Sequence, residues 1–156
     1  MSDPVNLFAV ALAADDDDPD GYRSSYARVG PLIGASALGL SVYELSRGQS
    51  ICPYHYEYPE EEWLIVLEGR ATLRDPDGEH ELEPWDAVCF PTGPAGAHKV
   101  TNRTDERLLV AMLSTKHPTA VAVYPDSDKI GAWSGDGEVK HLFRRADAVD
   151  YYDGEL

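Results

Sequence analysis

The chain has 156 residues, of which 43% are hydrophobic and 26% charged, so both length and composition fit one globular domain with one core. Thirteen Lys and Arg against 28 Asp and Glu give a net charge of −15, which disfavours nucleic acid and anionic membrane surfaces as partners. Cys52 and Cys89 lie among apolar residues and are predicted to be buried free thiols, so we expect a cytoplasmic protein.

The first 35 residues predict an N-terminal arm rather than a domain. A short helix is expected over residues 6–14, followed by an acidic run at residues 15–18 and several Gly and Pro. Residues 36–124 are predicted to form a β-barrel, and residues 125–156 a C-terminal extension that packs on it.

From residue 36 the pattern changes to short apolar or alternating runs separated by turn residues, which is typical of an all-β sandwich or barrel. The predicted strands cover residues 38–46, 51–58, 63–68, 71–74, 79–83, 87–91, 98–102, 107–114 and 120–124. Residues 63–67 and 108–113 are apolar on both faces, so a second sheet, the arm or another subunit must cover one face. A homodimer is one hypothesis that follows.

Four side chains in three separated segments carry the candidate chemistry. His55 and Glu57 lie two residues apart, so in a strand they point to the same face. Glu62 and His98 each begin a further strand, and a barrel can bring all four groups together in its mouth. Two imidazoles with one or two carboxylates suit one divalent ion of manganese, iron, zinc or nickel, with positions left open for substrate.

The same segments resemble the two sequence motifs of the cupin superfamily. The first motif matches Pro-Tyr-His-Tyr-Glu at residues 53–57, with Glu62 and Gly69 at the family's spacing. The second matches Pro91-x-Gly93 with His98 and Asn102. The resemblance covers about residues 36–115 and implies the cupin double-stranded β-helix, a barrel of jelly-roll type whose metal ligands come from the two motifs.

The resemblance places the metal ligands at His55, Glu57, Glu62 and His98. Three features depart from the family pattern: Glu57 stands where a second histidine is usual, Trp85 replaces a glycine, and the loop 93–98 is two residues longer. A carboxylate in place of an imidazole makes the site harder, which favours manganese or ferrous iron over copper.

We therefore expect a single-domain cupin that binds one divalent metal and binds or acts on a small polar organic molecule. If it is an enzyme, dioxygenase, isomerase and decarboxylase chemistries all remain open, because the fold does not choose among them. The alternative is a non-catalytic binding or sensing module without metal. No basic recognition helix is visible in the arm or tail, which disfavours direct DNA binding.

Several other residues have a structural explanation. His80, His117 and His141 lie outside the motifs and are expected at the surface. Asn102 is expected to bond the local backbone. Tyr54, Tyr56 and Tyr58, opposite the proposed ligands, are expected in packing or a subunit contact.

Overall fold

A computed structural model describes residues 2–14 and 17–155. Its largest sheet has six strands in the order β1-β2-β3-β10-β5-β8, with neighbouring strands antiparallel. These strands are β1 (Ala13–Ala14), β2 (Ser25–Arg28), β3 (Leu38–Leu45), β10 (Leu108–Thr115), β5 (Glu62–Glu68) and β8 (Ala87–Phe90).

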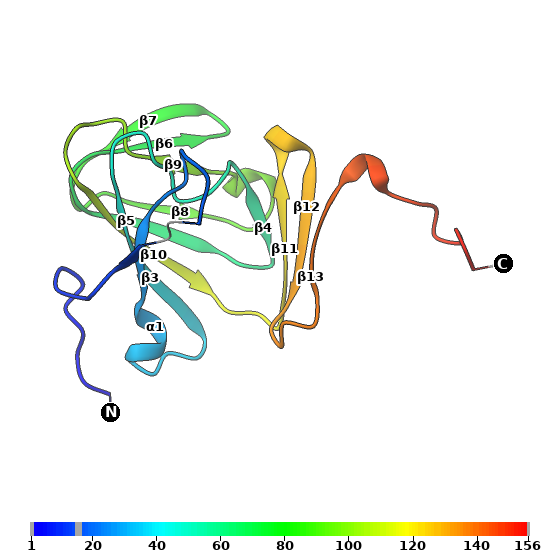
Figure 1. The fold of residues 1–156 in the computed structure, drawn as a ribbon, viewed down its shortest axis with the longest axis horizontal. Coiled ribbons are helices and arrows are strands. Elements are labelled where there is room, and N and C mark those ends of the chain that lie inside the picture. Colours follow the sequence, from blue (N-terminus) through cyan, green and yellow to red (C-terminus); the bar gives the residue numbers. More distant parts are fainter. Residues whose placement is uncertain (1, 15–16, 156) are drawn as a thin grey trace.

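Two smaller antiparallel sheets complete the architecture (Figure 1). The order β7-β6-β9 joins β7 (Gly78–Leu82), β6 (Ala71–Asp75) and β9 (Lys99–Thr101). The order β13-β12-β11-β4 joins β13 (Lys140–Arg144), β12 (Lys129–Ser134), β11 (Thr119–Tyr124) and β4 (Tyr56–Tyr58). The helical elements are short: α1 (Val29–Leu32) and 3-10 turns at Pro94–Gly96, Pro125–Ser127 and Arg145–Asp147. Among the described residues, no helix is long and apolar enough to cross a membrane.

The core lies between the sheets, and strand alternation fills it. Leu108 and Val110 of β10 are fully buried in the interior cluster, together with Leu64 and Val66 of β5. Leu73 and Val100 close this cluster from the small sheet β7-β6-β9. The predicted all-β barrel is confirmed.

The N-terminal arm covers the second apolar face. Leu109 and Ala111 point away from the interior and, with Val42 and Leu67, form a second buried cluster. Val5, Leu7, Val10 and Leu12 of the arm pack against this cluster. Of the three coverings that the sequence left open, the arm is therefore the one observed.

The helix expected over residues 6–14 is wrong. The structure has turns there and then strand β1, which pairs with β2. Val5, Leu7, Val10 and Leu12 are half-buried while the residues between them are exposed, so the irregular chain places these four side chains on the sheet. A short isolated helix would be marginal.

The strand expected over residues 51–58 is shorter than predicted: β4 starts at Tyr56, and His55 forms an isolated bridge to His98. The segment 125–156 adds β12 and β13 to the sheet of β11, and the residues after β13 extend away from the barrel (Figure 1). Boundaries at residues 35 and 124 stay a prediction.

Candidate functional site

Three of the four predicted ligands meet inside the barrel. One ligand atom each from His55, Glu62 and His98 lies within 4.8 Å of the others. Oε2 of Glu62 is 3.8 Å from Nε2 of His55 and 3.6 Å from Nε2 of His98. His98 is more than thirty residues away from His55 and Glu62 in the chain, yet the ligand atoms of all three lie together in the structure.

Backbone contacts orient both imidazoles. The backbones of His55 and His98 bond each other in both directions, at 3.1 and 2.8 Å, and hold the rings side by side. Nδ1 of His55 donates to the carbonyl of Pro53 at 3.1 Å, and Nδ1 of His98 donates to that of Gly96 at 2.9 Å. In each neutral ring the proton is thus on Nδ1, and the Nε2 lone pair faces the site.

Burial sets the protonation of these groups. His98 is 1% exposed, and loss of solvation lowers the pKa of its imidazole to about 4. Burial likewise lowers the pKa of His55 and raises the pKa of Glu62 to about 7. Without a cation, the site therefore holds neutral imidazoles and a carboxyl group that titrates near neutrality.

The donor set fits a divalent metal ion. Among the described residues, Nε2 of His98 is a buried polar atom with no hydrogen-bond partner, which is costly unless a ligand satisfies it. Two imidazole nitrogens and a carboxylate oxygen in this arrangement suit iron, manganese or zinc, and the second nitrogen of each ring is held as in known metal sites.

Glu57 lies beside this group rather than within it. Its Oε1 is 3.7 Å from Nε2 of His55, but it is not one of the three mutually close ligands. Burial, followed by repulsion from Glu62 and Glu60, raises the pKa of Glu57 well above its ordinary value. Glu57 is thus a carboxyl group that can hold a proton at neutral pH.

Two neighbouring cavities lie at the site. The inner one, of about 200 Å³, is lined by Tyr43, Ile51, Cys52 and Met112 together with the three candidate ligands. The outer one, of about 490 Å³, shares Tyr43, Glu62 and Met112 with it and adds Glu57. Glu62 therefore lies between the two cavities, whereas His55 and His98 line only the inner one.

Two cations line the outer cavity, Arg28 at the end of β2 and Lys116 just after β10. Arg28 pairs with Ser41 of β3, which in turn pairs with Met112 of β10, so one row across three strands runs from the guanidinium to the cavity wall. The sequence did not indicate either cation, because their position depends on the pairing of β2, β3 and β10.

The other predicted residues lie as follows. Asn102 is fully buried and bonds local backbone: its Nδ2 donates to the carbonyls of Leu45 and Glu106, both at 2.8 Å. His80, His117 and His141 are exposed, as predicted. Tyr54 packs under the guanidinium of Arg74.

The prediction that both cysteines are core residues is wrong. Cys89 is exposed, because β8 is the edge strand of its sheet and alternation directs Phe90, not Cys89, to the interior. Cys52 is partly buried and lines the inner cavity, with its Sγ 3.5 Å from Nδ1 of His55. Burial raises the pKa of the Cys52 thiol, which keeps it protonated.

Comparison with known proteins agrees with this architecture. Residues 41–114 match the model of the Cupin domain family. A sugar phosphate isomerase of the cupin superfamily from Silicibacter pomeroyi is 27% identical, with a TM-score of 0.82 over 97% of this chain and 98% of that one. No curated protein matches the chain in sequence.

Two further solved structures are similar. A candidate sugar phosphate isomerase from Acidithiobacillus ferrooxidans is 27% identical, with a TM-score of 0.76 over 83% of this chain and 81% of that one. A polyketide cyclase from Streptomyces resistomycificus is 23% identical, with a TM-score of 0.60 over 74% and 80% of the two chains, and shares the fold.

Proposed function

Because the chain belongs to the cupin superfamily, with its Cupin domain over residues 41–114, we propose that it is a metal-dependent enzyme that isomerises a small sugar phosphate. The observation that carries the proposal is the convergence of His55, Glu62 and His98 at the inner end of an accessible cavity. These three residues would hold one divalent ion of manganese, iron, zinc or nickel.

A bound divalent ion supplies Lewis acidity toward the carbonyl or hydroxyl oxygens of a substrate. The side chains of the protein form the cavity in which the ion and the substrate would be held. Tyr43, Ile51 and Met112 line the inner cavity beside the three candidate ligands.

Two observations support this substrate class, one from the relatives and one from the residues that line the outer cavity. The similar protein from Silicibacter pomeroyi, matched over nearly its whole length, is named a sugar phosphate isomerase. In this chain the outer cavity is lined by two cations, Arg28 and Lys116, as well as by Glu57, Glu60 and Glu62. A substrate with a phosphate at one end and hydroxyl groups at the other can place its phosphate at these two cations.

Glu57 is the candidate proton carrier. Interconversion of an aldose and a ketose moves one proton between neighbouring carbons and one between their oxygens, so it requires a group that both accepts and donates protons. The raised pKa of Glu57 meets that requirement near neutral pH. Its place outside the group of three ligands leaves its carboxylate available for this role.

The first experiment measures metal content by plasma mass spectrometry on untagged protein purified without chelator. We expect near-stoichiometric metal in the wild type and loss of it in a His55→Ala/His98→Ala double variant. The metal-loaded protein is then incubated in D₂O with aldose and ketose phosphates of different chain lengths, and ¹H NMR follows product formation and deuterium uptake at carbon.

Glu57→Gln separates the two roles of this residue. Retained metal with loss of deuterium exchange supports a proton carrier, whereas lost metal identifies Glu57 as the fourth ligand. A metal-loaded wild type that binds sugar phosphates without turnover or exchange would leave the non-catalytic binding module as the function. A well-folded wild type that takes up no metal would contradict the metal site itself.

A further inference from the structure

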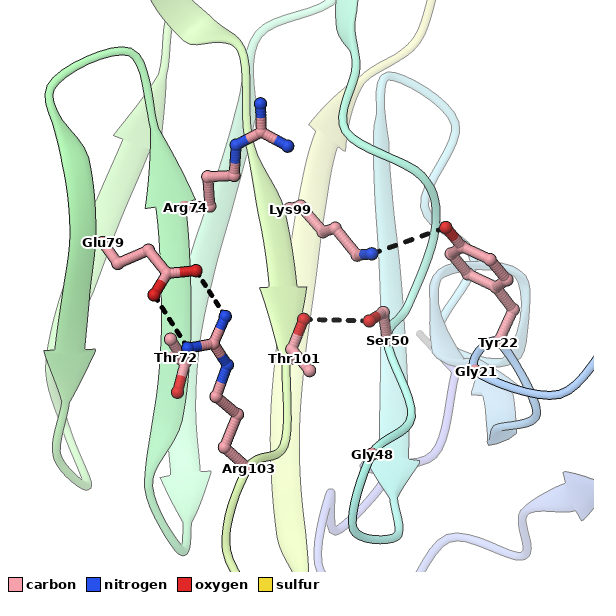
Figure 2. Close-up of a pocket in the computed structure, with 10 residues that line it drawn as sticks. All are labelled: Gly21, Tyr22, Gly48, Ser50, Thr72, Arg74, Glu79, Lys99, Thr101 and Arg103. Atoms are coloured by element: carbon pink, nitrogen blue, oxygen red, sulfur yellow. Dashed lines mark hydrogen bonds and ion pairs between the residues drawn. The ribbon is translucent and has the colours of Figure 1, made fainter. Parts of the chain in front are cut away.

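A separate pocket, of about 290 Å³, lies on the outer face of the sheet β7-β6-β9 (Figure 2). It shares no lining residue with the two cavities described above. Its lining residues are Gly21, Tyr22, Gly48, Ser50, Thr72, Arg74, Glu79, Lys99, Thr101 and Arg103.

Strand alternation builds this pocket. Leu73 and Val100 point into the core, so their neighbours on β6 and β9 point outward. Thr72 pairs with Thr101, and Arg74 pairs with Lys99, which places two hydroxyls and two cations on one outer face. Ser50, in the segment between β3 and β4, forms a hydrogen bond with Thr101, with 2.9 Å between their side-chain oxygens.

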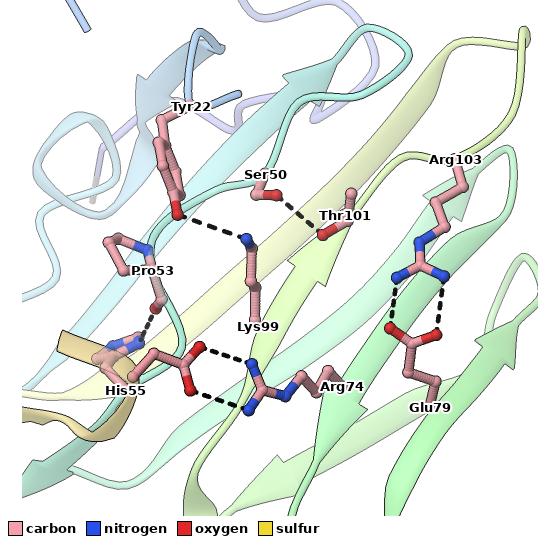
Figure 3. Close-up of polar contacts among 10 residues, drawn as sticks. Tyr22, Ser50, Pro53, His55, Arg74, Glu79, Lys99, Thr101 and Arg103 are labelled. Carbon is pink, nitrogen blue, oxygen red and sulfur yellow. Dashed lines mark hydrogen bonds and ion pairs between the residues drawn. The ribbon is translucent and has the colours of Figure 1, made fainter. Parts of the chain in front are cut away.

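The lining is basic although the chain as a whole is acidic. Three cations line the pocket against one carboxylate, Glu79, in a protein whose net charge is −15. Arg103 forms a double ion pair with Glu79. Arg74 forms one with Asp126, at 2.6 and 3.0 Å, and both guanidinium groups are thereby held in place (Figure 3).

Lys99 differs from the two arginines. Its Nζ is 3.4 Å from the hydroxyl of Tyr22 and 5.1 Å from the centre of that ring, at the middle of the pocket (Figure 2). Within the described part of the chain, no carboxylate forms an ion pair with this ammonium. An ammonium has three N–H donors, and one contact to Tyr22 leaves donors available for a ligand.

A hydroxyl donor lies beside this ammonium. The Ser50 and Thr101 hydroxyls share one hydrogen bond, which uses one of their two protons, so the other can be donated outward. Thr72 is engaged, because its hydroxyl donates to Glu81 at 2.7 Å.

We propose that this pocket binds a phosphate group, free or carried by a small monoester, with the Lys99 ammonium as its anchor. A tetrahedral dianion can accept bonds from the ammonium and from the free hydroxyl together. The unpaired charge comes from Lys99, because each flanking guanidinium is already paired with a carboxylate. The pocket is larger than a single phosphate, so an organic group attached to it can be accommodated. This site is independent of the proposed isomerase activity.

The test is a titration of the full-length protein followed by ¹H–¹⁵N NMR, with inorganic phosphate in one arm and glycerol phosphate in the other. Chloride keeps the ionic strength constant, because surface charge effects are screened by salt. We expect saturable shifts at the amides of Ser50, Lys99 and Thr101. Tighter binding of the monoester identifies an organic phosphate as the ligand, and equal binding identifies the free ion.

Three variants make the assignment specific. Lys99→Gln should weaken binding about tenfold or more, because it removes a charge-assisted hydrogen bond. Lys99→Arg should retain most of the affinity, and Lys140→Gln, at an exposed lysine on β13, should leave it unchanged. The spectrum and thermal melt of each variant report its folding. Non-saturable shifts, unchanged affinity in Lys99→Gln, or shifts confined to the surroundings of Arg28 and Lys116 would overturn the proposal.

Discussion

Nε2 of His98 lies 3.6 Å from Oε2 of Glu62 and, among the described residues, has no hydrogen-bond partner. A buried nitrogen whose lone pair faces a carboxyl group and the Nε2 of a second imidazole is an arrangement that a cation completes. The hydrogen bond from Nδ1 of His98 to the carbonyl of Gly96 keeps the Nε2 lone pair directed into the cavity.

Divalent metal should therefore stabilise the fold. A ligand that binds the native state alone adds about 2.7 kcal/mol at a concentration one hundred times its Kd. Thermal unfolding of chelator-treated protein should shift upward with added Mn²⁺ or Zn²⁺, and the shift should vanish in His98→Ala. His80→Ala is the matched control, because His80 is exposed and outside the site. An equal shift in His98→Ala would place the metal elsewhere.

The stability of the metal-free protein should depend on pH in two opposing ways. The lowered pKa of His98, about 4 against an ordinary 6.5, means that stability rises with pH between these values. The raised pKa of Glu62, about 7 against an ordinary 4.5, means that stability falls as pH rises through that window. Above pH 6.5 the carboxyl effect remains, with a slope of at most about 1.4 kcal/mol per pH unit for each group.

Urea unfolding at a series of pH values measures this dependence. Glu62→Gln should reduce the fall above pH 6.5, because the amide does not titrate, and the part that remains should come from Glu57, whose pKa is raised to about 8. Metal affinity should change in the opposite sense and increase with pH, since the ligands must lose their protons to bind. A metal-free protein whose stability increases steadily from pH 6.5 upward would contradict the raised pKa of Glu62.

Arg28→Gln should impair substrate binding more than chemistry. If Arg28 anchors the phosphate end of the substrate, its loss should raise KM about tenfold or more with a smaller change in kcat, because the interaction is made in ground and transition states alike. Steady-state kinetics with the sugar phosphate that shows turnover measures the split. Arg70→Gln, at an exposed arginine outside the cavities, should behave as wild type. A normal KM in Arg28→Gln would remove this residue from the binding site.

Asn102→Ala should destabilise the fold without altering the metal ligands. The amide donates to the carbonyls of Leu45 and Glu106, and its Oδ1 accepts from the backbone N–H of Thr104. Loss of these partners in a fully buried position should cost about 3 kcal/mol in the free energy of unfolding. Urea denaturation measures the loss. Unchanged metal stoichiometry in the folded variant would separate this role from ligation.

Trp85→Gly should not destabilise the protein. Trp85 has a φ of 76° and its side chain is 71% exposed, so it holds a left-handed conformation with little burial in return. Relief of this strain is worth about 1 kcal/mol or more, which offsets the entropy cost of glycine. We expect equal or higher stability in urea denaturation, whereas Trp85→Ala keeps a Cβ and should gain less. A clear loss in Trp85→Gly would assign the indole a contact that its exposure does not indicate.

Local pattern determined much of this protein. Period-two alternation predicted most strands of the barrel to within one or two residues, because a strand that is half buried must place apolar side chains on one face. The sequence placed His55 and Glu57 within one strand and Glu62 and His98 at the start of two others. Three of these four residues, His55, Glu62 and His98, meet in the structure.

Tertiary structure decided what depends on strand order and on the pairing of distant segments. The arm is extended rather than helical, because it gains its stability from the apolar face of β3 and β10. Cys89 is exposed because β8 is an edge strand, which its local sequence does not reveal. Cross-strand pairing places Arg28 at the outer cavity beside the candidate metal site. It likewise places Lys99 in the separate pocket on the sheet β7-β6-β9. Sequence periodicity reports which face a side chain takes, whereas the neighbours on that face are set by long-range pairing.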